Sequence, residues 1–253
     1  MSELYGPEPE LAPCFNEVVG KNIIISINGN IGSGKSRLLQ QLIRKYKGRT
    51  DICFLDEPVE EWKNLKDDNG MDLIENYYKD QKKYAFPFQI NAFVSRFSKI
   101  KEAVNKNKYK FIITERCIQT DKHVFAKMLY DIKLMSKLEY EVYLSLFKDF
   151  TEILNNTVFI YMKTEPNICY DRVKLRNRGG EEDIPLDYLE SCHKYHEEWI
   201  LDDIHRHKLV INGNIDVRKD PTIDDTWTKT FDSFINYYDY NMIDEHSMNV
   251  LYV

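Results

Sequence analysis

A glycine-rich loop near the start of the chain constrains the fold more than any other feature. Residues 23–36 read IIISINGNIGSGKS, in which Gly29, Gly34, Lys35 and Ser36 match the pattern G-x-x-x-x-G-K-[ST]. A β-branched apolar run precedes the loop, and a run typical of a helix, 35–46, follows it. A strand, loop and helix in this order bind the phosphates of a nucleoside triphosphate through backbone N–H groups and the positive end of the helix.

The loop therefore predicts a site for a triphosphate donor with Mg²⁺. In such a site Lys35 supplies a positive charge and Ser36 ligates the metal. A chance glycine-rich turn is the alternative, and the flanking strand and helix disfavour it. The residues predicted to bind phosphate are Gly29, Asn30, Ile31, Gly32, Ser33, Gly34, Lys35 and Ser36.

Four further short, apolar runs indicate the rest of a sheet. They are 52-ICFL-55, 111-FIIT-114, 157-TVFIYM-162 and 208-KLVI-211. Each is too short for a buried helix, and longer helical stretches separate them. The pattern predicts the α/β class, with a five-stranded parallel sheet flanked by helices. Three prolines within residues 1–20 predict an irregular N-terminal arm, and we expect residues 21–253 to form one domain.

Composition limits the partners. The 253 residues include 41 acidic and 35 basic side chains, a net charge of −6, which argues against nucleic acid or an anionic membrane as a partner. The five cysteines form no C-x-x-C pair and favour free thiols in a reducing compartment. No apolar run approaches the roughly 20 residues of a spanning helix, and the first residues do not resemble a mitochondrial leader. We expect a cytoplasmic protein.

The second predicted strand ends in a candidate general base. The run 52-ICFLDEP-58 places Glu57 directly after the strand, where it can face an acceptor lying across from the γ-phosphate. A motor ATPase would usually place its acidic pair further along the chain. The alternative is a solvated glutamate at a strand end.

A long helical stretch carries candidate base-recognition residues. In 88-FQINAFVSRFSKIKEAVN-105, Gln89, Ala92 and Arg96 are spaced by three and four and share one helix edge. A carboxamide and a guanidinium beside a small side chain can hydrogen-bond the edge of a nucleobase. The spacing alone also fits an ordinary amphipathic helix with polar flanks.

The third predicted strand delivers Glu115 and Arg116 to the edge of the sheet where α/β proteins bind ligands. One can hold Mg²⁺, and the other can stabilise charge at the reacting oxygens. Asp121 follows and can pair with Arg96, an arrangement that is often only structural.

A basic segment, 167-NICYDRVKLRNRGGEED-183, is a candidate lid. Arg172, Arg176 and Arg178 are placed to neutralise charge on a triphosphate, and Gly179–Gly180 provide a hinge. A solvated basic helix end is the alternative.

Five ordered motifs together resemble the deoxyribonucleoside kinases, the deoxycytidine, deoxyguanosine and deoxyadenosine kinases in particular. They are GNIGSGKS, EPVEEW, FPFQ with the downstream Arg96, ER followed by Asp121, and RVKLRNRGGEEDIPLDYLE. The resemblance runs from about Lys21 to about Ile211. It implies a P-loop kinase fold with an arginine-rich lid, ATP as the phosphoryl donor, Mg²⁺, a deoxynucleoside acceptor and a homodimer.

The resemblance also implies roles for single residues. Glu57 would accept the proton of the 5′-hydroxyl with Arg116 nearby, and Glu115 would join Ser36 at the magnesium ion. Tyr78 and Glu181 would contact the sugar 3′-hydroxyl. Trp62 and Phe125 would form aromatic walls. The residues implied at the base are Gln89, Ala92, Arg96 and Asp121, and those implied in the lid are Arg172, Arg176 and Arg178.

The combination of Ala92, Arg96 and Asp121 favours deoxycytidine or a deoxypurine over thymidine. An Arg–Asp pair offers both a donor and an acceptor to a base that bears an amino group, whereas the thymine methyl group needs an apolar wall. Two alternatives stay open at this stage. One is a nucleoside monophosphate kinase of the same lineage, which would need a further cationic pocket. The other is a nucleotide-dependent switch or ATPase, although the chain has no N-K-x-D motif.

Overall fold

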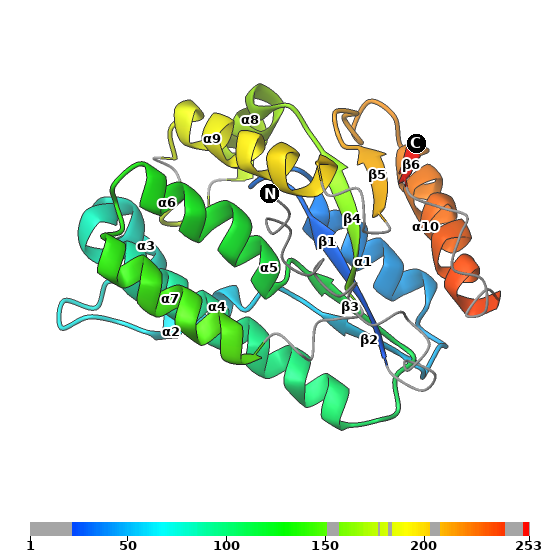
Figure 1. The fold of residues 1–253 in the computed structure, drawn as a ribbon. Helices are drawn as coiled ribbons and strands as arrows, with labels where there is room; N and C mark the ends of the chain where they lie inside the picture. The colour runs from blue at the N-terminus through cyan, green and yellow to red at the C-terminus, as the bar shows by residue number, and fades with distance from the viewer. Residues whose placement is uncertain are drawn as a thin grey trace, which may run out of the picture.

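The computed structural model describes residues 22–150, 157–176, 178–181, 184–202, 208–240 and 250–252; the predicted arm, 1–20, lies outside them. Six parallel strands form one sheet in the order β2-β3-β1-β4-β5-β6 (Figure 1). All five predicted runs are strands, and a short sixth strand adds to β5. The strands are β1 (Ile23–Asn28), β2 (Ile52–Leu55), β3 (Phe111–Glu115), β4 (Thr157–Lys163), β5 (Lys208–Asn212) and β6 (Val250–Tyr252).

Helices connect successive strands and lie on both faces of the sheet (Figure 1). The predicted helix at 88–105 is the C-terminal part of a 25-residue helix that begins at Gln81 and includes Pro87. The π-helical segments are η2 (Asp121–Ala126) and η4 (Glu197–Leu201). The α-helices are α1 (Lys35–Lys45), α2 (Val59–Asn64), α3 (Leu73–Lys79), α4 (Gln81–Asn105), α5 (Ile118–Thr120), α6 (Lys127–Asp131), α7 (Lys137–Phe150), α8 (Pro166–Arg176), α9 (Leu186–His196) and α10 (Ile223–Tyr240).

Strand β1 separates two hydrophobic cores because successive side chains of a strand point to opposite faces. Ile25 belongs to the core that α1 and α10 cover, whereas Ile24 belongs to the core under α4 and α7. Both residues are buried, as expected for a central strand with helices on both faces. Burial on both faces fixes the register, in which Ile25 pairs with Ile113 of β3 and Val158 of β4.

The parallel arrangement brings the ends of three strands to one edge of the sheet. The glycine-rich loop follows β1, Glu57 follows β2, and Arg116 follows the last residue of β3, Glu115. Ligands bind at this carboxyl edge in open α/β sheets. No helix among the described residues is long and apolar enough to cross a bilayer.

Candidate active site

The glycine-rich loop has a backbone that only glycine adopts easily. Gly29, Gly32 and Gly34 have φ angles of 143°, 79° and 107°. A Cβ atom on Gly32 would lie 2.6 Å from the carbonyl oxygen of Cys169. The loop is therefore held tightly against α8, with its backbone shaped to surround a phosphate.

Lys35 lies at the start of α1 with its side chain buried inside the loop. Its Nζ atom donates a hydrogen bond to the carbonyl oxygen of Asn30 at 2.6 Å. Burial, reinforced by the positive charge of Arg116, lowers the pKa of Lys35 from 10.5 to about 7. An anion in the loop would offset that cost, since an opposite charge favours the protonated form.

Ser36 and Glu115 form a polar pair beside the loop. The Ser36 hydroxyl donates to Glu115 Oε1 at 2.9 Å. Burial raises the pKa of Glu115, and the negative charge of Glu57 raises it further. A buried carboxylate destabilised in this way is suited to a divalent cation. Two oxygen ligands also fit Mg²⁺, which commonly takes one or two protein ligands together with phosphate oxygens and water.

Glu57 is the centre of a buried ionic network. Its Oε1 atom accepts hydrogen bonds from Arg96 Nη2 at 2.6 Å and from Arg116 Nη1 at 2.5 Å. Burial alone would raise the pKa of Glu57, but the charges of Arg116 and Arg96 outweigh burial and lower it from 4.5 to about 2. Both bonds end on Oε1, so Oε2 is the oxygen without a partner among the described residues and can accept a hydrogen bond from an acceptor hydroxyl.

Arg116 is held in an unusual backbone conformation. Its φ angle is 60°, in the left-handed region that non-glycine residues seldom occupy. The Thr114 hydroxyl donates to its carbonyl oxygen at 2.8 Å, and its guanidinium lies 5.1 Å from the ring centre of Phe125. Local strain maintained by such contacts is typical of functional sites, and here it directs the guanidinium toward Glu57.

The other end of the cavity carries unsatisfied polar atoms. Gln89 Oε1 and Arg96 Nη1 are buried and have no hydrogen-bond partner among the described residues. Arg96 Nε lies 3.3 Å from Asp121 Oδ2. Burial outweighs the attraction of Arg96 and raises the pKa of Asp121 from 3.8 to about 6. Buried polar atoms normally have partners, so these donors and acceptors fit the polar edge of a ligand.

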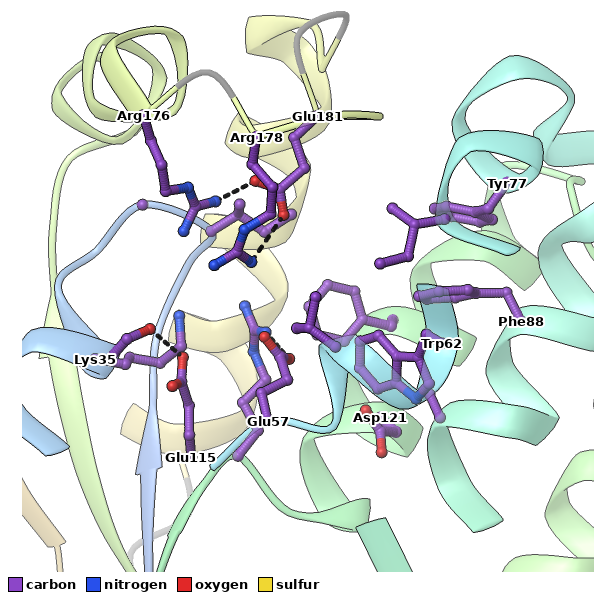
Figure 2. Close-up of a pocket in the computed structure, with 18 of the residues that line it drawn as sticks. Lys35, Glu57, Trp62, Tyr77, Phe88, Glu115, Asp121, Arg176, Arg178 and Glu181 are labelled. Carbon is purple, nitrogen blue, oxygen red and sulfur yellow. Dashed lines mark hydrogen bonds and ion pairs between the residues drawn. The ribbon is translucent and has the colours of Figure 1, made fainter. Parts of the chain in front are cut away.

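Aromatic side chains form the wall opposite the phosphate loop (Figure 2). Trp62 packs edge-on against Phe88, with ring centres 5.4 Å apart, and its Nε1 atom donates to Ser95 Oγ at 2.9 Å. Tyr77 stacks on Phe88 at 4.5 Å and shares a 2.9 Å hydrogen bond with the hydroxyl of Tyr188. Phe88, Tyr77 and Tyr188 were not predicted as site residues. Two of the quoted motifs contain members of this group, FPFQ for Phe88 and RVKLRNRGGEEDIPLDYLE for Tyr188.

The three predicted lid arginines lie in two different settings. Arg172 is half-buried and donates to the carbonyl oxygens of Ser33 at 3.4 Å and Ile215 at 3.0 Å, so it braces the phosphate loop. Arg176 and Arg178 both pair with Glu181, the latter through Nη1 and Oε1 at 3.4 Å. All three arginines line the cavity.

One cavity of about 240 Å³ brings most of the predicted site residues together. Six further residues that were not predicted for the site also line it: Arg37, Val59, Ile74, Tyr77, Phe88 and Tyr188. Gly29, Asn30 and Ser33 belong to the loop but do not line the cavity. The predicted residues that line it are Ile31, Gly32, Gly34, Lys35, Ser36, Glu57, Trp62, Tyr78, Gln89, Ala92, Arg96, Glu115, Arg116, Asp121, Phe125, Arg172, Arg176, Arg178 and Glu181.

Comparison with known proteins identifies relatives over most of the chain. The deoxynucleoside kinase family model matches residues 25–236. A probable deoxycytidine kinase of Fowlpox virus is 37% identical over 198 residues, covering 76% of this chain and 79% of its own. Human deoxycytidine kinase is 30% identical over 204 residues, covering 70% and 75%. Human mitochondrial thymidine kinase 2 is 31% identical over 186 residues, covering 72% and 65%.

Proposed function

The chain belongs to the deoxynucleoside kinase family, and from that premise we propose that it transfers the γ-phosphoryl group of ATP to the 5′-hydroxyl of deoxycytidine or a deoxypurine nucleoside in preference to thymidine. The observation that carries the proposal is the buried Arg96–Asp121 pair, which lies in the same cavity as the phosphate loop and is joined to Glu57 through Arg96. Base recognition and phosphoryl transfer then occupy opposite ends of one site.

The donor end would act mainly through charge and position. Backbone N–H groups of residues 29–36 would surround the β-phosphate, and Lys35 would contact the transferred group. Mg²⁺ held by Ser36 and Glu115 would neutralise charge on the β- and γ-phosphates when bound. Arg176 and Arg178 would approach from the opposite side and stabilise charge as the terminal phosphoryl group leaves.

Glu57 would orient the acceptor hydroxyl. Its Oε2 atom accepts the hydroxyl proton, while Arg96 and Arg116 hold Oε1 and keep the carboxylate ionised at neutral pH. A carboxylate with a pKa of about 2 is a weak base, so early proton abstraction is not its main contribution. Most of the rate enhancement would come from fixing the hydroxyl in line with the γ-phosphate, which suits the loose transition state of phosphoryl transfer.

The base would be read by the polar atoms left unpaired in the cavity. Gln89 Oε1 can accept a hydrogen bond from an exocyclic amino group, and the free Nη1 of Arg96 can donate to a ring nitrogen or carbonyl. Cytosine and the purines of the natural deoxynucleosides bear amino groups. The thymine methyl group would instead face the buried charges of Arg96 and Asp121, which disfavours it.

The sugar would lie between these two ends. We assign its 3′-hydroxyl to Tyr78 and Glu181, which both line the cavity, and its faces to Trp62 and Phe125. A monophosphate acceptor would need a cation for its phosphate, and the candidates near the predicted base site are Arg96 and Lys122. Arg96 already contacts both Glu57 and Asp121, and Lys122 does not line this cavity. This favours a nucleoside over a nucleoside monophosphate as acceptor.

We further propose that residues 21–253 form one catalytic domain that works as a homodimer in the cytoplasm. Leu138 and Val142 on α7 and Val94 on α4 are large apolar side chains that remain exposed, Leu138 by 75%. Such side chains are favourable at a subunit interface. The buried cysteines are free thiols, which fits a reducing compartment. Light scattering of the purified protein would detect the dimer.

The reaction is tested by steady-state turnover of the four natural deoxynucleosides and of their 5′-monophosphates with ATP and Mg²⁺. We expect efficient turnover of deoxycytidine or a deoxypurine nucleoside and poor turnover of thymidine. Turnover of the monophosphates alone would replace the proposal with a monophosphate kinase, and hydrolysis of ATP without any acceptor dependence would support a nucleotide switch.

A further inference from the structure

Glu181 lies where the phosphate end of the cavity meets the sugar. It follows the hinge glycines of the lid, yet its side chain is only 10% exposed. Arg176 Nη2 donates to its Oε2 atom, and Arg178 Nη1 donates to Oε1 at 3.4 Å (Figure 2). Both carboxylate oxygens therefore carry a bond from an arginine.

These pairs conflict with the roles proposed for the same residues. A guanidinium that binds phosphate must turn its N–H groups toward the phosphate oxygens, and a carboxylate left beside them would be repelled by the triphosphate. Glu181, in turn, cannot offer its full acceptor capacity to a sugar hydroxyl while both oxygens are bound by arginines. The two arrangements therefore compete for the same N–H donors and carboxylate oxygens.

The backbone beside Glu181 packs closely against α3. Gly180 has a φ angle of 83°, and a Cβ atom there would lie 3.3 Å from the backbone nitrogen of Glu75. The lid thus rests on α3, the helix that supplies Tyr77 and Tyr78 to the cavity. A carboxylate released from the arginines would already be next to the nucleoside, so no large lid displacement is required.

We propose that Glu181 exchanges partners during the reaction and thereby couples donor binding to nucleoside binding. The triphosphate takes Arg176 and Arg178 away from Glu181, and the freed carboxylate accepts the hydrogen bond of the sugar 3′-hydroxyl. Each ligand then strengthens the binding of the other by the same factor, as linkage requires. This inference rests on the proposed function, because it uses the phosphate and sugar roles assigned there.

The test is the dissociation constant of deoxycytidine, measured by calorimetry with and without saturating β,γ-methylene-ATP and Mg²⁺. For the unmodified protein we expect the analogue to tighten deoxycytidine binding by about 5-fold or more, the lower end of typical coupling between sites. In Glu181→Gln the neutral amide forms no ion pair with Arg176 or Arg178, so the coupling factor should fall to near 1. The amide can still hydrogen-bond a hydroxyl, so deoxycytidine should bind in the absence of the analogue. Glu190→Gln, on the exposed face of α9, is the matched control and should keep the full coupling.

Arg178→Gln provides a second variant that leaves Glu181 in place. It should weaken binding of the analogue and also reduce the coupling, because one of the two exchanged bonds is missing. Two results would overturn the inference alone: both ligands bind and react but with a coupling factor of 1, or Glu181→Gln couples them as strongly as the unmodified protein. Failure of the analogue to bind by itself, or of deoxycytidine, deoxyadenosine and deoxyguanosine all to bind by themselves, would overturn the proposed function together with the inference.

Discussion

Replacing Glu57 with glutamine tests the centre of the ionic network. The substitution keeps the size of the side chain but removes the charge that pairs with Arg96 and Arg116, both about 5% exposed. It also removes the acceptor of the hydroxyl proton. Two separate quantities should change, the free energy of unfolding and the turnover number.

The stability change follows from the pKa of Glu57. A fall from 4.5 to about 2 corresponds to roughly 3 kcal/mol of folding stability, since each pH unit is worth about 1.4 kcal/mol. Because the pKa is lower in the folded protein, this contribution is complete above pH 4.5 and is lost as the pH falls through about 2. At pH 7.5 Glu57→Gln should therefore lower the unfolding free energy by about 3 kcal/mol in urea, a size typical of breaking a buried ion pair.

The turnover number should fall by about 10²-fold or more, because the acceptor hydroxyl would no longer be held in line with the γ-phosphate. Binding of β,γ-methylene-ATP should survive, since the phosphate loop is untouched. Glu60→Gln is the matched control, because the Glu60 side chain lies on the next helix and is 85% exposed; it should change neither quantity. A folded Glu57→Gln protein that keeps more than a tenth of the normal turnover would refute the role of Glu57.

Three further predictions concern the base, the phosphate and the loop. The double variant Arg96→Met with Asp121→Ala should lower the ratio of kcat/KM for deoxycytidine to that for thymidine by at least tenfold. The reason is that one good base contact discriminates by about 1–3 kcal/mol. An unchanged ratio would show that neither residue takes part in base recognition. Triphosphate binding at pH 8 should take up protons, because Lys35 has a pKa of about 7 and a bound anion raises it; calorimetric heats that do not depend on the buffer would contradict this. Gly32→Ala should weaken triphosphate binding more than tenfold through its clash with α8, whereas Gly70→Ala, which has a similar φ angle but open space around it, should not; equal effects of the two would argue against a shaped loop.

The sheet could be predicted from the sequence because buried parallel strands have short, continuous runs of apolar, β-branched residues. The runs at 23–27 and 111–114 are of this kind, and both are central strands. The edge strand β6, Val250–Tyr252, has only three residues, and so short an apolar run does not by itself predict a strand. Its pairing with β5 depends on where the chain returns in space, which local sequence does not specify.

Site residues that belong to sequence motifs could be predicted. Contacts between residues far apart in the sequence could not. The loop residues and Glu57 could be predicted because each comes directly after a predicted strand. The Arg96–Asp121 pair could be predicted from the opposite charges of the two residues. The bond between Arg96 and Glu57 joins residues 39 positions apart, and the Tyr77–Tyr188 bond joins residues 111 positions apart. These groups come together only where α3, α4, α9 and the segment after β2 surround one cavity, so spacing along the chain gave no indication of them.

A competition experiment tests the central claim most directly. Equal concentrations of deoxycytidine, deoxyadenosine, deoxyguanosine and thymidine are mixed with the protein, limiting ATP and Mg²⁺, and the 5′-monophosphates are separated and counted. The ratio of products then equals the ratio of kcat/KM values. The Arg96–Asp121 pair predicts that thymidine monophosphate is the least abundant product. Thymidine monophosphate as the main product would contradict the assignment of the base pocket, and the absence of all four monophosphates would contradict the proposed reaction.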